Sequence, residues 1–255
     1  MKTNYPMEAF ALAMVVFSLN MQEAMITGII LLLITVLGFL FDQFFGRKLP
    51  AWSRKLCMVI ILLAVTYSLF QVIILGYFKG NLDQRTVFLQ LAIGALIAKH
   101  VLKAEEINYS SILYESAFSY GALILIAVIR EFLSYGTIYD YKLTDADFLT
   151  SGFQNVILGF LMSAIAIAVL NRIFRYEDLK TESLWVILPV ILVNQPFSMD
   201  LKWESIGVLV SIAVAILFVY SVRMFLIFSN VRKEWKRLPI ELVSVSIIYL
   251  TLMVF

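Results

Sequence analysis

The residues of this chain that could most readily do chemistry are the charged residues that interrupt apolar stretches. Arg130 and Glu131 are adjacent and lie near the end of a long apolar stretch. Ionisable groups inside a membrane helix are costly and usually face a partner or water, so this pair is a candidate for an ion path or a structural anchor. The alternative is that Arg130 extends its charged end to the membrane surface.

A second candidate is the polar pair Asn194 and Gln195, which lies between Pro189 and Pro196. Each proline removes a backbone donor, so we expect the helix to kink or unwind near the pair. Broken helices of this kind can bind a small solute or ion at the working site of a transporter. The alternative is an ordinary short helix.

Other reactive residue types are scarce. Cys57 is the only cysteine and His100 the only histidine. A single cysteine excludes an internal disulfide, and its apolar surroundings favour a small packed residue. We interpret His100 as a residue at the membrane surface and the acidic stretch 139–147 as a solvated loop that could also collect cations. The sequence contains no phosphate-binding glycine loop, zinc-ligand spacing or catalytic triad pattern.

The composition of the chain defines its class. Of 255 residues, 62% are hydrophobic and 15% charged, with a mean hydropathy of +0.91. This predicts an all-α, polytopic membrane protein. A bilayer-spanning helix needs about 20 apolar residues, so three of the apolar stretches predict short or broken helices. The short stretches are 6–19, 87–98 and 184–199, and the long ones are 24–45, 56–78, 112–133, 153–174, 206–228 and 238–255.

Positive charge predicts how these segments cross. With nine crossings and a cytoplasmic N-terminus, fifteen of the twenty Lys and Arg residues fall on one side and five on the other. Lys and Arg accumulate in cytoplasmic loops, so nine crossings with an external C-terminus are expected. The net charge of +2 therefore reflects orientation, and we predict no nucleic-acid partner. We expect no cleaved signal peptide and a mature chain that begins at Met1.

The segments also suggest repeats. Each short segment precedes a helix that we expect to open with a glutamate, at Glu23, Glu115 and Glu204, with spacings of 92 and 89 residues. We therefore predict three three-helix units, 1–82, 83–180 and 181–255, with the second inverted. The alternative is that each glutamate only favours the helix dipole in a first turn.

Four stretches resemble the six-helix integral membrane subunits of Rnf and sodium-translocating NADH:quinone reductase (Nqr) complexes. Residues 129–140 are similar to the family's Arg-Glu-(apolar)-(apolar)-x-x-Gly-Thr-(apolar)-x-Asp stretch, and here contain Arg130, Glu131, Gly136 and Thr137. Residues 188–195 resemble its Leu-Pro-…-Asn-Cys helix. Residues 21–28 and 236–242 resemble the start of its second helix and the beginning of its last.

The resemblance implies that residues 1–180 match one six-helix subunit and residues 181–255 the last three helices of its sister. It implies a subunit of an ion-translocating or electron-transport complex in the bacterial cytoplasmic membrane, with further membrane subunits as partners. Glu131, Gly136 and Thr137 would then line a path or support the structure. The alternatives are a secondary transporter with a site at Pro189, Asn194, Gln195 and Pro196, and a membrane scaffold.

The family's iron–sulfur ligands are missing from this chain. The positions that match its cluster cysteines are Leu12, about Leu96, and Gln195. A cluster needs four thiolate or imidazole ligands, which one cysteine and one histidine do not supply. We therefore expect no cofactor bound by this chain and a non-catalytic subunit, with flavin or iron–sulfur groups in its partners.

Overall fold

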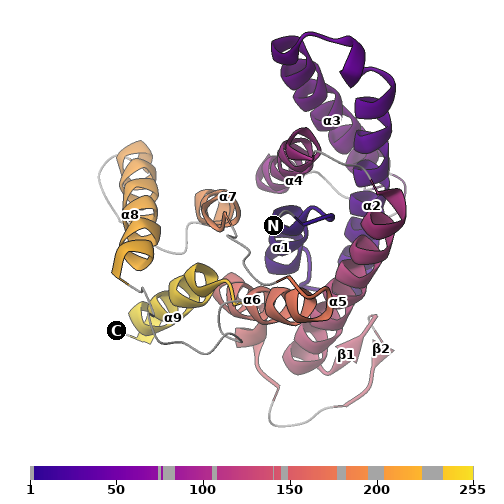
Figure 1. Ribbon diagram of the computed structural model, residues 1–255. Helices are drawn as coiled ribbons and strands as arrows, with labels where there is room; N and C mark the ends of the chain where they lie inside the picture. The colour runs from indigo at the N-terminus through magenta and orange to yellow at the C-terminus, as the bar shows by residue number, and fades with distance from the viewer. Residues whose placement is uncertain are drawn as a thin grey trace.

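The computed structural model describes residues 3–73, 76, 84–104, 108–139, 141–144, 149–176, 182–194, 204–225 and 238–254. These residues form an all-α membrane protein with one small β-hairpin, β1 (Thr137–Ile138) and β2 (Tyr141–Lys142) (Figure 1). Two single-turn helices, η1 (Gly46–Lys48) and η3 (Ser151–Gln154), precede α3 and α6. The α-helices are α1 (Met7–Val16), α2 (Met21–Phe44), α3 (Ala51–Ile73), α4 (Gln84–Lys103), α5 (Tyr109–Tyr135), α6 (Val156–Ile173), α7 (Leu184–Asn194), α8 (Glu204–Phe225) and α9 (Ile240–Val254).

Helix length and composition distinguish two groups. Within the described residues, the five helices α2 to α6 are long and apolar enough to cross a membrane. In α1, α7, α8 and α9, the apolar part of the helix that the structure describes is only 10–17 residues long, which is too short by this measure. The structure therefore contains an apolar helix near every predicted segment, but it supports five crossings by this measure rather than nine. The nine-crossing arrangement stays a prediction.

The prediction of a short segment at 87–98 is wrong. Helix α4 has 20 residues because polar residues at both ends continue the helix beyond the apolar stretch. Its last turns contain Lys99, His100 and Lys103, whose polar ends form contacts beyond the apolar layer. Apolar length alone therefore underestimates a helix whose ends are polar.

Asparagine side chains set the starts of three helices. The Asn20 Oδ1 atom accepts a hydrogen bond of 2.7 Å from the Glu23 amide in α2, and the Asn108 Oδ1 atom accepts one of 3.3 Å from the Ser111 amide in α5. Asn155 caps α6 in the same way. These caps satisfy backbone donors that have no partner inside the helix. Glu115 consequently lies in the second turn of α5 and not at its opening, as the repeat spacing predicted.

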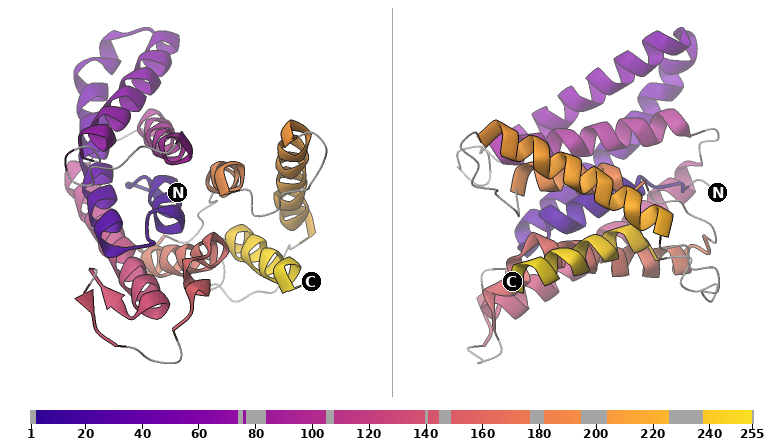
Figure 2. Two further views of the ribbon diagram at one scale, coloured as in Figure 1. Left: turned by 180° about the vertical axis from the view of Figure 1, so that it is seen from behind. Right: turned by 90° about the vertical axis from the view of Figure 1, so that its left-hand side faces the viewer.

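Helix α1 lies at the centre of the assembly (Figures 1 and 2). It packs against α2, α4, α5, α6 and α7, and most of its ten residues are buried. Three of them are alanines, Ala9, Ala11 and Ala13, each with no exposed surface. Small side chains allow neighbouring helices to approach closely in a membrane, where packing replaces the hydrophobic effect as the main attraction.

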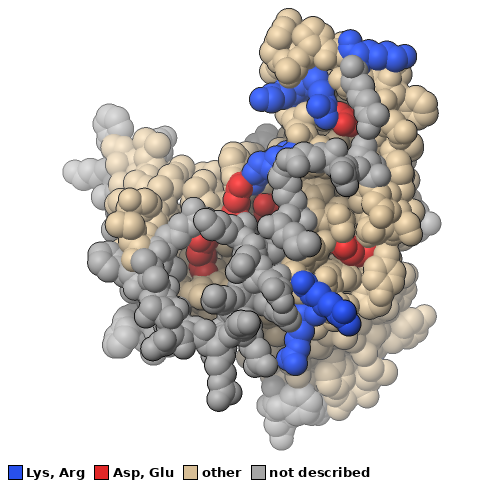
Figure 3. All heavy atoms as spheres, in the orientation of Figure 1, with Lys and Arg blue, Asp and Glu red and all other residues tan. Residues whose placement is uncertain are grey.

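The remaining helices form paired layers around α1. Helix α2 packs along α5, α3 along α4, and α6 against α1, while α7 contacts α1, α4 and α8, and α9 contacts α6 and α8. Large apolar side chains such as Ile60, Leu125 and Leu209 are more than half exposed on the outer faces. Figure 3 shows Lys and Arg side chains in separate groups on this face, with Asp or Glu side chains beside some of them. Such apolar outer faces are suited to contact with lipid.

Candidate functional site

The first polar site lies where the C-terminal ends of α1 and α5 meet the start of α6, and we call it the Arg130 corner. It comprises Arg130, Glu131, Ser18, Gly136, Thr137 and the backbone atoms that they contact. Arg130 has no exposed surface. Its guanidinium donates to the carbonyl of Val15 at 3.0 Å and to the Ser18 hydroxyl at 2.7 Å. It also donates to the carbonyls of Phe153, Gln154 and Asn155 at 3.1 to 3.3 Å.

These contacts explain how a cation is held inside the protein. All five acceptors among the described residues are neutral oxygens, and the Val15 carbonyl belongs to the C-terminal end of α1, where the helix dipole is negative. The fork of the guanidinium joins α5, the end of α1 and the segment leading into α6. The alternative that Arg130 extends to the membrane surface is therefore wrong, because its charged end is buried among carbonyl groups.

A glycine makes this approach geometrically feasible. A Cβ atom at Gly159 of α6 would lie 2.7 Å from the Val15 carbonyl oxygen and 3.2 Å from Nη1 of Arg130. Both distances are shorter than normal contacts of a methyl group. The absence of a side chain at Gly159 thus lets α6 lie directly against the end of α1 while the guanidinium occupies the space beside them.

Glu131 anchors the start of α2 at the same corner. It is only 3% exposed, and its Oε2 atom accepts a 2.7 Å hydrogen bond from the amide of Met21, the first residue of α2. That amide has no acceptor within the helix, and the helix dipole is positive there, so a carboxylate is the favoured partner. The Oε1 atom accepts a longer bond of 3.4 Å from the Thr137 hydroxyl. Glu131 and Thr137 therefore connect α5 to α2 and to β1.

Gly136 terminates α5. Its φ of +66° is in the left-handed region, and its amide donates to the carbonyl of Phe132. A Cβ atom here would lie 2.3 Å from the carbonyl oxygen of Thr144, so the position has both a conformational and a steric reason for glycine. Arg130, Glu131, Gly136 and Thr137 thus lie at and just beyond the C-terminal end of α5, and their role as path-lining or structural residues stays a prediction.

The second predicted group lies elsewhere. Pro189 is inside α7, which continues as an α-helix to Asn194 and packs against α1, α4 and α8. Gln195 and Pro196 lie outside the described residues, as does the segment 195–203 where the break was expected. The kink or unwinding near the polar pair stays a prediction.

A second buried polar site, which we call the Glu115 network, surrounds Glu115 near the other end of α5. Glu115 is 7% exposed. Its Oε1 atom accepts a hydrogen bond from the Asn4 side-chain amide and its Oε2 atom accepts one from the Tyr176 hydroxyl, both at 2.7 Å. The backbone amide of Asn4 in turn donates to the Tyr176 oxygen at 3.1 Å, and the His100 Nε2 atom lies 3.1 Å from the backbone carbonyl oxygen of Asn4.

The donors to Glu115 are neutral and stay protonated. Burial raises the pKa of Tyr176 well above its usual range, and burial also raises the pKa of the nearby Tyr5. The carboxylate therefore accepts hydrogen bonds from an amide and a phenol that do not titrate at ordinary pH. Charge-assisted bonds of this type are stronger than bonds between neutral groups.

Sequence reasoning gave Glu115 a different meaning. We used it as a marker of the repeat and as a candidate for a helix-opening carboxylate, although it lies inside the apolar stretch 112–133. That position is the signal that identifies it as a buried group. Asn4 and Tyr176 carry no such signal, because both lie in connecting segments far away in the sequence.

A third group of charges connects α1, α4 and the start of α7. Lys99 lies 3.6 Å from Glu8, forms an ion pair with Glu182, and is positioned 4.9 Å from the ring centroid of Trp185. Lys103 donates to Glu182 at 2.7 Å. Hydrogen bonds from Lys103 and Lys99 lower the pKa of Glu182 to about 2. These contacts join the third predicted unit to the first two.

One further buried side chain escaped sequence analysis. Gln90 of α4 is 1% exposed, and within the described part of the chain neither its amide oxygen nor its amide nitrogen has a hydrogen-bond partner. An unsatisfied buried amide is unfavourable by about 1–3 kcal/mol. It lies one turn before Gly94, where α4 approaches Thr66 of α3. Its position inside the apolar stretch 87–98 is the signal that could have identified it as a buried polar group.

The described residues contain no group of three or more His, Cys, Asp and Glu side chains close enough to hold a metal ion. Leu12 and Leu96, at the positions of the resembled family's cluster ligands, are buried apolar side chains of α1 and α4. No family model, curated protein or solved structure matches this chain.

Proposed function

We propose that this chain is an integral membrane subunit of an Rnf/Nqr-like electron-transport or ion-translocating complex in a bacterial cytoplasmic membrane, without iron–sulfur ligands of its own. The observation that supports this proposal is the Arg130 corner. The stretch 129–140, which resembles the family's motif, supplies the buried Arg130 and Glu131, and these two residues hold α1, α2 and the start of α6 together. The residues that carry the resemblance are therefore the same residues that join these helices.

The pairing of helices supports inverted repeats as part of this proposal. If the two units are copies, α1 corresponds to α4, α2 to α5 and α3 to α6. Under this correspondence, the observed contact of α3 with α4 matches the observed contact of α6 with α1, and the contact of α2 with α5 matches itself. The capping residues Asn20 and Asn108 are also each followed, 22 residues later, by a buried charge, Asp42 and Arg130. Units 1–82 and 83–180 would then be inverted copies, and unit 181–255 would repeat the first.

Nine crossings, a cytoplasmic N-terminus and an external C-terminus belong to the same proposal. The contacts of Lys99 and Lys103 with Glu182 favour a common side for the end of α4 and the start of α7. Attaching a cysteine-reactive, membrane-impermeant probe to single cysteines placed at residues 48, 142 and 182 in a Cys57→Ser background tests this topology. Labelling of 142 from outside and of 48 and 182 only after lysis is expected, and the reverse would refute the orientation.

The complex itself is tested by gentle detergent purification from the native membrane. We expect other membrane subunits at fixed stoichiometry, identified by mass spectrometry, and flavin or iron in the purified assembly. A stable, colourless chain without partners would contradict the proposal. Glu131→Leu serves as a second measurement, because loss of the Met21 contact should weaken assembly without removing a cofactor ligand.

The Glu115 network favours a second candidate function, ion-coupled secondary transport. A buried carboxylate with neutral donors can exchange a proton for a small cation, and intramembrane carboxylates commonly mark such paths. Protein reconstituted in liposomes would then move protons or Na⁺ when a gradient is imposed, and Glu115→Gln would abolish this flux while Gln195→Leu would abolish solute uptake. Unchanged flux in folded Glu115→Gln protein would exclude this role for Glu115.

A further inference from the structure

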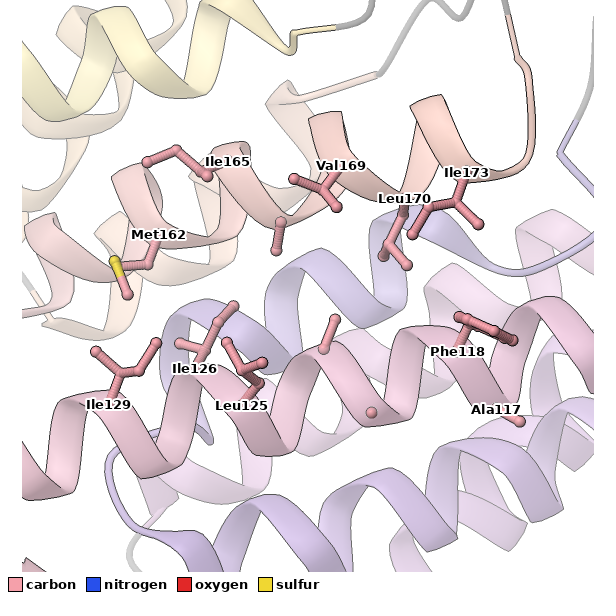
Figure 4. Close-up of a pocket in the computed structure, with 13 residues that line it drawn as sticks. Ala117, Phe118, Leu125, Ile126, Ile129, Met162, Ile165, Val169, Leu170 and Ile173 are labelled. Atoms are coloured by element: carbon pink, nitrogen blue, oxygen red, sulfur yellow. The ribbon is translucent and has the colours of Figure 1, made fainter.

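The outer face between α5 and α6 contains an open, apolar groove of about 600 Å³ (Figure 4). Figure 4 shows the two helices side by side, with Ile129 near Met162 at one end and Phe118 near Ile173 at the other. The thirteen side chains that line it are all apolar. The groove lies on the side of these helices away from α1, where Leu125, Ile165 and Val169 are at least half exposed.

Small residues of both helices contribute to the lining of the groove. Ala117, Gly121 and Ala122 belong to α5 and Ala166 belongs to α6; Ala117 and Gly121 are exposed, and a Cβ atom at Gly121 would meet no other atom within 4 Å. The lining residues of α5 extend over 117–129, which corresponds to about 18 Å of helix. One leaflet contributes about 15 Å of a 30 Å hydrocarbon core. The groove thus has the length of one lipid chain.

One end of the groove is positively charged. Arg172 is adjacent to the lining residue Ile173 and is one turn beyond Val169 on the same side of α6. Arg175 follows directly after the helix, and both arginines are exposed. The opposite end, at Ile129 and Met162, is apolar. The charge is therefore at the end where α6 leaves the apolar layer, which is the level of lipid headgroups.

An aromatic cluster borders the same end. The ring centroids of Tyr114 and Phe118 are 4.8 Å apart, and Phe174 lies edge-on to Phe118 at 6.0 Å. Tyr114 is 56% exposed. Aromatic rings of this type are enriched at the boundary between hydrocarbon and headgroups. Groove, aromatic boundary and arginines thus follow the order of chain, glycerol region and phosphate in a phospholipid.

We propose that this groove binds an anionic phospholipid, with an acyl chain between α5 and α6 and the phosphate at Arg172 and Arg175. Basic pockets between membrane helices on the cytoplasmic side bind anionic headgroups, and guanidinium groups pair with phosphate through two parallel hydrogen bonds. Charge and groove act together, since the arginines select the headgroup while the small residues of the groove lining leave room for the chain. The site is independent of the proposed complex and of the Glu115 network.

Native mass spectrometry of the purified chain tests this site with phosphatidylglycerol and phosphatidylcholine of identical acyl chains. We expect at least a fivefold preference for phosphatidylglycerol in the unmodified protein. The double variant Arg172→Gln/Arg175→Gln should reduce phosphatidylglycerol binding to the level of phosphatidylcholine. The matched control Lys48→Gln/Lys55→Gln removes two exposed charges near the start of α3 and should retain the preference.

The groove itself is tested with Gly121→Leu, which adds a large side chain to the groove lining at a position where a Cβ atom meets no other atom. Binding of both lipids should fall at least threefold, while the thermal unfolding of the protein stays unchanged. Equal loss of preference in the Lys48→Gln/Lys55→Gln control would overturn the proposal, because it would indicate attraction by general charge. A dimer or a co-purified subunit that is lost only in Gly121→Leu would also overturn it, since a protein helix would then occupy the groove.

Discussion

The Arg130 corner and the Glu115 network lie near opposite ends of α5 and beside opposite ends of α1. They differ in the sign of the charge that they bury and in the groups that hydrogen-bond to it. Arg130 is a permanent cation surrounded by neutral oxygens of three segments. Glu115 is a carboxylate held by two neutral donors. A guanidinium offers only hydrogen-bond donors, whereas an ionised carboxylate offers only acceptors. The two sites therefore join distant segments of the chain through opposite charges and opposite kinds of hydrogen bond.

The largest effect should come from Arg130→Met. The substitution removes the donors to Val15, Ser18 and the carbonyls before α6, and it leaves these buried acceptors without partners. Breaking buried charged contacts typically lowers stability by about 3–5 kcal/mol. Thermal unfolding in detergent measures this loss, with Lys55→Met as an exposed control. Wild-type stability in Arg130→Met would show that the corner does not hold the helices.

A smaller but still large effect is expected for Glu115→Leu. Asn4 and Tyr176 would each lose a buried acceptor, so stability should fall by about 2–3 kcal/mol. Glu115→Gln retains one acceptor oxygen and should lose about half as much. If the two substitutions had equal effects on unfolding, the hydrogen bonds would not be the source of the stabilisation, and the contrast with Arg130 would weaken.

Gly136→Ala should cost about 1–2 kcal/mol. The position combines a left-handed backbone with a Cβ that would lie 2.3 Å from the Thr144 carbonyl oxygen. Gly121→Ala in the same helix is the matched control, because its Cβ would meet open space. Alanine in a helix interior is more favourable than glycine by about 0.5–1 kcal/mol, so this control should be neutral or stabilising. Equal destabilisation by both substitutions would mean that the effect comes from replacing any glycine, and not from the left-handed backbone and close contact at Gly136.

Thr137→Val should have a minor effect, about 0.5 kcal/mol, because its bond to Glu131 is 3.4 Å long. The stronger Met21 contact of Glu131 stays in place. Chemical denaturation can resolve a change of this size against Arg130→Met. A loss comparable to that of Arg130→Met would mean that the hairpin, and not the guanidinium, organises the corner.

The smallest effect should come from Glu182→Gln, and it should depend on pH. The folded pKa of Glu182, about 2, is below its ordinary value, so the carboxylate stabilises the fold above the ordinary value and loses this contribution as pH falls towards 2. Because the side chain is 39% exposed, water screens the pair and the effect is modest. Unfolding of both proteins from pH 7 to pH 3 should converge at the acidic end. A constant difference would assign the effect to packing.

Part of the Arg130 corner could be predicted from the sequence, because four of its five residues lie within eight positions and two of these, Arg130 and Glu131, interrupt an apolar stretch. The contact with Ser18, 112 residues away, could not. The Glu115 network could not, since it joins Asn4, Glu115 and Tyr176, whose separations exceed 60 residues. Gln90 illustrates a different difficulty. It interrupts the apolar stretch 87–98, but its burial and the absence of a hydrogen-bond partner within the described residues depend on how α4 packs against its neighbours.

The sequence by itself determined that this is a helical membrane protein and approximately where its helices lie. Apolar composition requires burial or contact with lipid, and a backbone in lipid must satisfy its own hydrogen bonds, so both properties are local. Only the tertiary structure decided that Arg130 is buried, that α4 is a full-length helix with polar ends in contact with other segments, and that Glu115 has partners. These properties depend on contacts between residues far apart in the chain, and local hydropathy contains no information about them.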